Sequence, residues 1–172
     1  GADELDAGLL EVPMVQRLCL GAERLQTRVV GNFSYTNRVP HGARFAAVGD
    51  AACFLDPVFS SGVTLALYGA GSLVDVLGPA LAAGREAEPE LLAEHTAAMD
   101  RACATFAGLI ERFYNSRLAE SMFLTNSLGM ELRRGVISVL AGDVWRTDNP
   151  YQEMLLKARR RGDADRGFSG AV

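Results

Sequence analysis

The stretch that decides the fold is RFAAVGDAACFLDPVFSSGVTLALYGAG, residues 44–71. Its first part, residues 44–48, is a nearly continuous apolar run, which is typical of a buried strand. Gly-Asp ends the run at 49–50, and an Asp-Pro turn follows at 56–57. After Ser-Ser-Gly at 60–62, apolar residues recur every three or four positions. The pattern predicts a strand, a turn and a helix.

Polar groups gather at the two junctions of this stretch. Asp50 would stand at the carboxyl end of the strand, where open α/β sheets bind ligands, and could accept hydrogen bonds from sugar or polyol hydroxyls. The helix beginning at Gly62 would offer partnerless amides and the positive end of its dipole. A β-carbon at Gly62 would collide with a flat ligand lying against those amides. Two plainer interpretations stay open: an ordinary Gly-Asp turn, and a serine that only caps the helix.

The rest of the chain predicts strands followed by helices. Residues 1–24 give mixed signals and predict irregular or edge structure. One or two strands are expected at 25–39, where β-branched and aromatic residues are frequent. The expected helices run from 62 to about 78, from about 89 along an apolar stripe to 113, over 118–127, over 130–141, and from a cap at Asn149-Pro150 onward, with Gln152 three residues after the asparagine. Gly69 and Gly71 inside the first helix predict that another element approaches closely.

The composition is that of a soluble globular protein and excludes several function classes. Of 172 residues, 49% are apolar and 22% charged, with a net charge of −4. No uninterrupted apolar run is long enough for a membrane span, and no extended basic face favours nucleic acid. Three widely spaced cysteines predict reduced thiols, and two isolated histidines predict no metal site. We expect a cytoplasmic protein without membrane or nucleic-acid partners.

The central motif resembles a known flavin-binding sequence. GDAACFLDPVFSSGVTLAL, residues 49–67, is similar to the second flavin-binding motif of FAD-dependent monooxygenase-type enzymes, and most of all to that of the flavin-dependent halogenases. FYNSR at 113–117 and AGDVWRTDNPY at 141–151 are similar to the helical C-terminal region of phenol- and pyrrole-type members. Phe59 replaces the glutamate of tryptophan-type members, and Thr64 stands where many members have histidine. The resemblance covers residues 25–152 and favours the phenol and pyrrole subtype.

The resemblance implies a fold and a set of ligand-binding residues. The fold would be an α+β fragment of an α/β FAD-binding fold of the hydroxybenzoate hydroxylase type, with few strands N-terminally and a mostly helical C-terminal region. The residues implied to bind FAD are Gly49, Asp50, Ala51, Pro57, Ser61, Gly62 and Val63. Ser61 and Gly62 match the position where backbone amides hold a halide, so chloride is the second expected ligand. Neither a catalytic residue nor a metal ligand is assigned.

Several family motifs are absent from the sequence, which predicts a partial enzyme. There is no G-x-G-x-x-G fingerprint, no W-x-W-x-I-P signature and no lysine in the catalytic context, since Lys157 stands elsewhere. We expect residues 1–78 to be the end of an FAD-binding and substrate domain, 79–161 a helical subdomain and 162–172 a disordered tail. The chain would need its missing N-terminal FAD-binding portion and would not be active alone.

The implied reaction is oxidative halogenation of an electron-rich aromatic, with reduced flavin and oxygen. The expected partners are a separate flavin reductase and an aromatic substrate that is either free or tethered to a carrier protein. One alternative is a flavin hydroxylase or an oxidoreductase similar to geranylgeranyl reductase, which would need no halide. The other is a non-catalytic helical binding module with a degenerate flavin motif.

Overall fold

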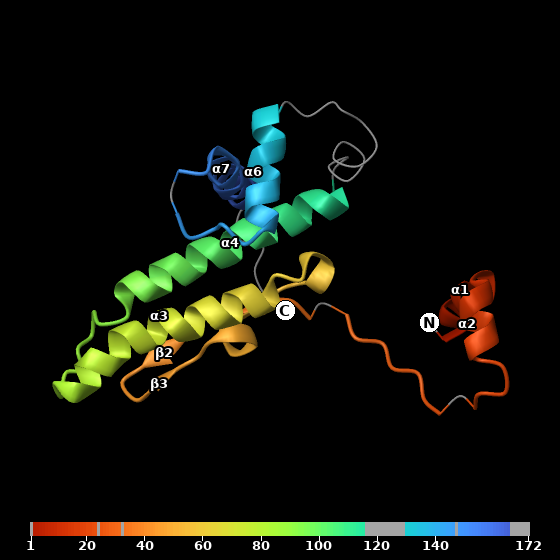
Figure 1. Ribbon diagram of the computed structural model, residues 1–172, viewed down its shortest axis with the longest axis horizontal. Helices are drawn as coiled ribbons and strands as arrows, with labels where there is room; N and C mark the ends of the chain where they lie inside the picture. Colours follow the sequence, from red (N-terminus) through yellow and green to blue (C-terminus); the bar gives the residue numbers. More distant parts are fainter. Residues whose placement is uncertain (1, 24, 32, 116–129, 147, 166–172) are drawn as a thin grey trace. The chain divides into compact units, whose positions relative to one another are not determined.

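The computed structural model describes residues 2–23, 25–31, 33–115, 130–146 and 148–165 (Figure 1). The chain divides into two compact units, residues 1–33 and 34–172. The first unit contains two short helices, α1 (Ala2–Glu11) and α2 (Pro13–Leu18). The expectation of irregular structure there was wrong, because Pro13 starts α2 rather than interrupting an apolar run.

The second unit carries the candidate site and most of the fold. Its elements in chain order are β1 (Tyr35–Thr36), β2 (His41–Gly42), β3 (Phe45–Ala46), the 3-10 turn η1 (Gly49–Ala51), β4 (Cys53–Phe54), the 3-10 turn η2 (Pro57–Phe59), α3 (Gly62–Ala82), α4 (Ala93–Asn115), α6 (Met130–Leu140) and α7 (Pro150–Asp165). β1 pairs with β4 and β2 with β3, both antiparallel, with Tyr35 opposite Phe54 and His41 opposite Ala46. The unit is therefore mostly helical, with two small strand pairs.

The buried strand expected at 44–48 is a short hairpin strand instead. β3 has two residues, and its only strand partner among the described residues is β2. The Phe45 side chain is 57% exposed and lies against Gly42, where a β-carbon would come within 2.5 Å of the ring. Apolar character alone did not imply burial, because burial needs a facing layer. Of the strands expected over 25–39, β1 alone is formed in the described part of that range.

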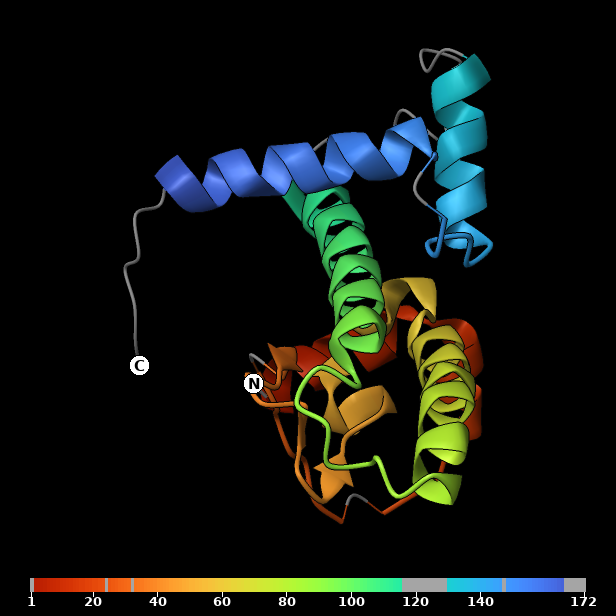
Figure 2. The same cartoon turned by 90° about the vertical axis from the view of Figure 1, so that its left-hand side faces the viewer.

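Within the described residues, four helices supply most of the core, and Figure 2 shows how they cross. α3 packs on α4, α4 on α7, and α6 on α7. The predicted stripe on α4 is confirmed by the burial of Cys103 and Phe106, and it also includes Leu109, which is fully buried. The helix predicted over 130–141 is confirmed as α6, whereas the one predicted over 118–127 lies outside the described residues.

Two helices end later than the sequence predicted. α3 continues through Pro79 to Ala82, four residues beyond the predicted end. It stops there because Gly84 adopts a left-handed conformation (φ 66°) and the Arg85 amide donates to the Ala80 carbonyl at 2.8 Å. α7 extends to Asp165, into the range expected to be a tail, and residues 166–172 lie outside the described part.

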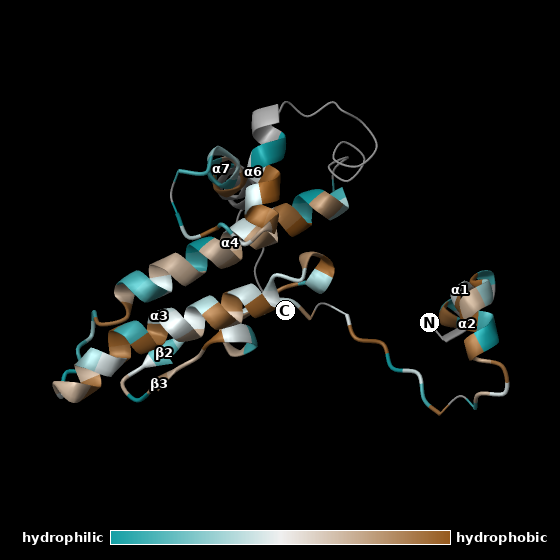
Figure 3. Ribbon diagram, in the orientation of Figure 1, coloured by the Kyte–Doolittle hydropathy of each residue, from teal (hydrophilic) through white to brown (hydrophobic). Residues whose placement is uncertain are grey.

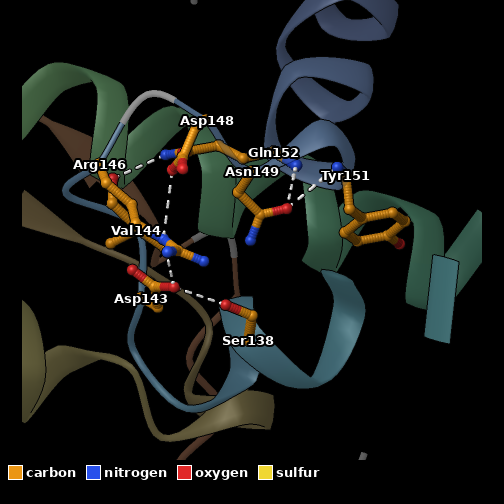
Figure 4. Close-up of polar contacts among 8 residues, drawn as sticks. All are labelled: Ser138, Asp143, Val144, Arg146, Asp148, Asn149, Tyr151 and Gln152. Atoms are coloured by element: carbon orange, nitrogen blue, oxygen red, sulfur yellow. Dashed lines mark hydrogen bonds and ion pairs between the residues drawn. The ribbon is translucent and has the colours of Figure 1, made fainter. Parts of the chain in front are cut away.

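The start of α7 is capped as predicted, but without a capping box (Figure 4). Asn149 Oδ1 accepts hydrogen bonds from the Tyr151 and Gln152 amides at 3.0 and 3.3 Å. The Gln152 side chain does not reach back to the cap. Its Nε2 donates instead to the Val144 carbonyl at 2.7 Å and to Thr105 Oγ1 at 3.1 Å, which ties α7 to α4.

Candidate functional site

An open cleft of about 630 Å³ lies between the two 3-10 turns and the start of α3. This volume is within the range of small-molecule sites. Six of the seven residues predicted to bind FAD line it: Gly49, Asp50, Ala51, Pro57, Gly62 and Val63. The residues that the sequence reasoning missed are Val48, Phe54, Leu55, Ser60 and Ala66. Ala66 could have been found, because it lies one helical turn after Gly62 and so shares its face.

Asp50 reaches the cleft from η1 and not from the end of a strand. The preceding strand stops at Ala46, so the predicted position at a sheet edge was wrong, although the side chain is exposed beside the cleft. Gly49 is required by its own backbone, with φ 58° and a β-carbon that would approach Ala66 to 3.1 Å. The Tyr35 hydroxyl donates to the Asp50 carbonyl at 2.6 Å and holds η1 from β1.

The turn before α3 is anchored to α4. Asp56 Oδ1 accepts from the Val58 amide at 3.0 Å, and Oδ2 accepts from the Tyr114 hydroxyl at 3.2 Å. Burial, and then the hydrogen bond to the Asp56 carboxylate, raise the pKa of Tyr114, so its hydroxyl keeps the proton that it donates. Phe59 meets the Phe113 ring edge-on at 5.3 Å. These contacts fix the direction in which the chain enters α3.

The first turn of α3 offers unpaired amides to the cleft. Within the described residues, the amides of Gly62, Val63 and Thr64 have no acceptor, and the first bond of the helix is from Leu65 N to Ser61 O at 3.1 Å. Space is open at Gly62, where an added β-carbon would meet only Asp50 Oδ1, at 3.8 Å. The turn itself contains no acidic residue, so the acidic group nearest to Gly62 is the Asp50 carboxylate, which comes from η1.

Ser61, the seventh predicted residue, lies behind the cleft surface. It is 4% exposed, gives no side-chain cap, and its hydroxyl is buried without a partner in the described structure. A buried polar group without a partner costs free energy, but Ser61 is not among the residues that line the cleft, so its hydroxyl is no evidence for a ligand there. The open amides fit a flat ligand with an electron-rich edge or a small anion. The flavin ring and chloride belong to these two classes, and their binding stays a prediction.

A second, smaller cavity of about 30 Å³ lies between the hairpin and α4. His41, Cys53, His95 and Cys103 are among its lining residues, and neither cysteine forms a disulfide bond in the described structure. His95 Nδ1 is 3.0 Å from Ser72 Oγ of α3. Burial, and secondly the His41 imidazole, lower the pKa of His95, so its neutral form is favoured. Among the described residues, no three His, Cys, Asp or Glu side chains could together hold a metal ion.

The segment that forms this cleft lies inside the range matched by a known protein family. The family model described as tryptophan halogenase matches residues 37–141. A sulochrin halogenase of Aspergillus terreus is 42% identical over 62 residues, 36% of this chain and 11% of that protein. A flavin-dependent halogenase of Armillaria mellea is 32% identical over 90 residues, 52% of this chain and 18% of that protein. A tryptophan 2-halogenase of Chondromyces crocatus is 40% identical over 65 residues, 37% of this chain and 12% of that protein.

The structure is also similar to part of a larger flavoprotein. A crystal structure of a flavoprotein/dehydrogenase from Cytophaga hutchinsonii matches 77% of this chain and 33% of its own, with a TM-score of 0.59 and 27% identity. The chain spans 11% to 18% of the length of the three curated relatives. These include a sulochrin halogenase and a tryptophan 2-halogenase, so similarity does not separate the subtypes. Because the family model matches more than half of the chain, the protein belongs to the tryptophan halogenase family, among flavin-dependent halogenases.

Proposed function

We propose that this chain forms the FAD- and halide-binding part of a flavin-dependent halogenase. The observation that carries the proposal is that the amides of Gly62 and Val63 have no acceptor within the described part of the chain, and that both residues line the same cleft as Asp50. The residues proposed to hold FAD are Gly49, Asp50, Ala51, Pro57, Ser61, Gly62 and Val63. Ser61 and Gly62 are also proposed to hold chloride.

The chain's own groups contribute binding and electrostatics. When bound, FAD supplies, from its reduced form and oxygen, the oxidising power that halogenation of an aromatic requires. The amides of Gly62 and Val63 donate hydrogen bonds to an electron-rich ring edge or to chloride, and the helix dipole favours negative charge there. The Asp50 carboxylate accepts hydrogen bonds from hydroxyl groups of the cofactor. The absence of a β-carbon at Gly62 lets the ligand approach the backbone.

The proposed substrate is an electron-rich aromatic of the phenol or pyrrole class, either free or tethered to a carrier protein. Phe59 supports this choice. Its ring packs edge-on against Phe113, so this position belongs to an apolar contact and supplies no carboxylate. A substrate whose recognition needs a carboxylate at this position, as expected for free tryptophan, would find no such group here.

The proposed partner is the remainder of a longer flavoprotein, working with a separate flavin reductase in the cytoplasm. One face of α3 supports this partner, because it carries exposed apolar side chains and begins at the cleft itself. The exposed residues are Val63 (70%), Leu67 (71%), Val74 (67%) and Leu81 (59%), named here the α3 outer stripe. A protein segment covering this stripe would also close the cleft at Val63. By length and composition alone α3 could cross a membrane, and membrane binding is therefore an outcome to test.

Halide dependence in the full-length protein containing this chain tests the reaction. The protein is incubated with reduced FAD, oxygen and aromatic substrates, with chloride, with bromide or without halide. We expect chlorinated and brominated products in the first two cases and no halogenated product in the third. Hydroxylated product formed equally well without halide would overturn halogenation in favour of a hydroxylase. Failure to retain flavin would favour a non-catalytic module.

Two variants test the site itself. Gly62→Val places a branched side chain over the amides, and we expect loss of bound flavin with the fold retained. Gly78→Val is the matched control, because it makes the same change on the same helix at an exposed glycine with open space around it, roughly 24 Å from Gly62 at 1.5 Å per residue. Its flavin content should equal that of the unchanged protein. Equal flavin content in both variants would contradict the placement of FAD at the start of α3.

A further inference from the structure

The turn between α6 and α7 contacts α3 next to the candidate site. Gly142 has a left-handed backbone (φ 87°), and a β-carbon there would come within 3.1 Å of Thr64 Cγ2. The Trp145 indole stacks on the Tyr68 ring, with centroids 3.4 Å apart and planes 7° from parallel. Thr64 and Tyr68 are four residues apart, so they lie on one face of α3, in its first two turns.

Hydrogen bonds from α6 and α7 hold this turn (Figure 4). The Asp143 carboxylate accepts from Ser138 Oγ of α6 at 2.6 Å and pairs with Arg146 Nε at 2.7 Å. The Val144 side chain is buried, and its carbonyl accepts from Gln152 Nε2 of α7, which also donates to Thr105 of α4. Gly142 and Trp145 are therefore presented to α3 from a fixed base.

The first turn of α3 needs such support, because helix ends fray and Ser61 gives no side-chain cap. The amides that the proposed site requires belong to this turn. We propose that Gly142 and Trp145 form a clamp on Thr64 and Tyr68, and that both act as positioning residues for the amides of Gly62 and Val63. This inference rests on the proposed function for its consequence in catalysis, but the clamp itself can be measured without any ligand.

Amide hydrogen exchange in the 172-residue chain tests the clamp directly. The reporters are the hydrogen-bonded amides of residues 65–68, whose protection depends on the first turn being formed. In Trp145→Ala we expect exchange of these amides to be roughly threefold to tenfold faster, the factor expected for loss of one stacked aromatic pair. Trp145→Phe should restore most of the protection, and amides near residue 80 should not change.

Two further variants keep the test decisive. If Trp145→Ala does not fold, Tyr68→Ala removes the same stack from a side chain that is 39% exposed. Leu81→Ala is the control on the far end of α3 and should leave residues 65–68 unchanged. Unchanged exchange of residues 65–68 in both stack variants would overturn the clamp. So would an equal increase throughout α3, which would indicate general destabilisation.

In the full-length protein, the clamp predicts an effect on binding more than on the reaction step. For Trp145→Ala we expect the dissociation constant for FAD and the KM for bromide to rise severalfold, with kcat changed less, and Trp145→Phe to reverse both. If the proposed function is wrong, the unchanged full-length protein will not bind flavin, but the faster hydrogen exchange in Trp145→Ala will still be observed. Normal flavin and bromide binding in Trp145→Ala would overturn the positioning role.

Discussion

The two faces of α3 both lack charged side chains, but they lie in opposite environments. One face packs inside the protein: Leu65 and Ala80 are buried, Gly69 lies against Met99, and Ser72 contacts His95. The other face is the α3 outer stripe, whose side chains are more than half exposed. Asp75 is the helix's one charged residue. The exposed face therefore carries larger apolar side chains than the buried one, the reverse of what a surface helix requires.

This difference indicates what kind of helix α3 is. A helix that is apolar on all sides is normally buried on all sides, whereas a surface helix has one polar face. Brown and pale segments dominate α3, while α4 alternates brown with teal (Figure 3). α4 has a polar face for solvent beside its buried apolar face, whereas α3 has no polar face. The outer stripe is therefore best explained as an interface of the longer flavoprotein proposed above.

The largest effect is expected from a charge on the outer stripe. Val74→Glu in the full-length protein should reduce the free energy of unfolding by about 3–5 kcal/mol, the cost of an unpaired charge in a buried contact. In the 172-residue chain the same change should stay within about 0.5 kcal/mol, because Val74 is exposed there. Chemical denaturation of both proteins gives the comparison. Equal effects would show that the stripe is uncovered in both, and loss of vesicle binding by the variant would instead favour a membrane.

The next largest effect compares two leucines, one on each face. Leu65→Ala should destabilise the 172-residue chain by about 2–5 kcal/mol, since Leu65 is 2% exposed and its removal leaves a cavity. Leu67→Ala, the control, should change stability by less than about 0.5 kcal/mol, since Leu67 is 71% exposed. Urea unfolding at one pH measures both. A cost at Leu67 equal to that at Leu65 would mean that the outer stripe is already covered, for example by a second copy.

A smaller effect concerns pH at the inner face. The pKa of His95 is lowered in the folded state, so below the unfolded value of about 6.5 the unfolded chain binds more protons. The stability contributed by neutral His95 is present above pH 6.5 and is lost as the pH falls through the folded pKa. Stability measured from pH 7.5 to 5 should therefore fall less steeply in His95→Gln than in the unchanged chain. His41→Gln removes the second cause of the lowered His95 pKa, so it should reduce the pH dependence of stability only in part. An unchanged slope in His95→Gln would contradict the assignment of this pH dependence to His95.

The sequence predicted the helices better than the strands, for a physical reason. The period of three to four residues in α3, α4 and α6 is a local property, and so is the cap at Asn149, so both could be read without knowing the fold. Burial of the run at 44–48 depends on a facing layer, which the sequence cannot specify. β4 was missed because Cys53-Phe54 is two residues long and is defined only by its pairing with β1.

The sequence located the segment that forms the cleft, but not its geometry. Six of the seven residues predicted to bind FAD line the cleft, yet Asp50 was placed after a strand, whereas η1 carries it. Nothing in the spacing indicated that Ser61 would be buried, or that Tyr114, 58 positions after Asp56, would hold the turn. The spacing also gave no indication that Trp145 would stack on Tyr68. Contacts between distant segments depend on the fold, which a local pattern does not report.

The smallest effect is expected at two glycines of α3, Gly69 and Gly71, for which the sequence gave the same prediction. A β-carbon at Gly71 would meet nothing within 4 Å, whereas one at Gly69 would come within 3.1 Å of Met99 Cε. Gly71→Ala should therefore stabilise the chain by about 0.5–1 kcal/mol, the gain from replacing glycine inside a helix. Gly69→Ala should gain less or lose stability, because Met99 must move. Thermal unfolding distinguishes them, and a gain at Gly69 as large as at Gly71 would show that the inner face is packed more loosely than these distances indicate.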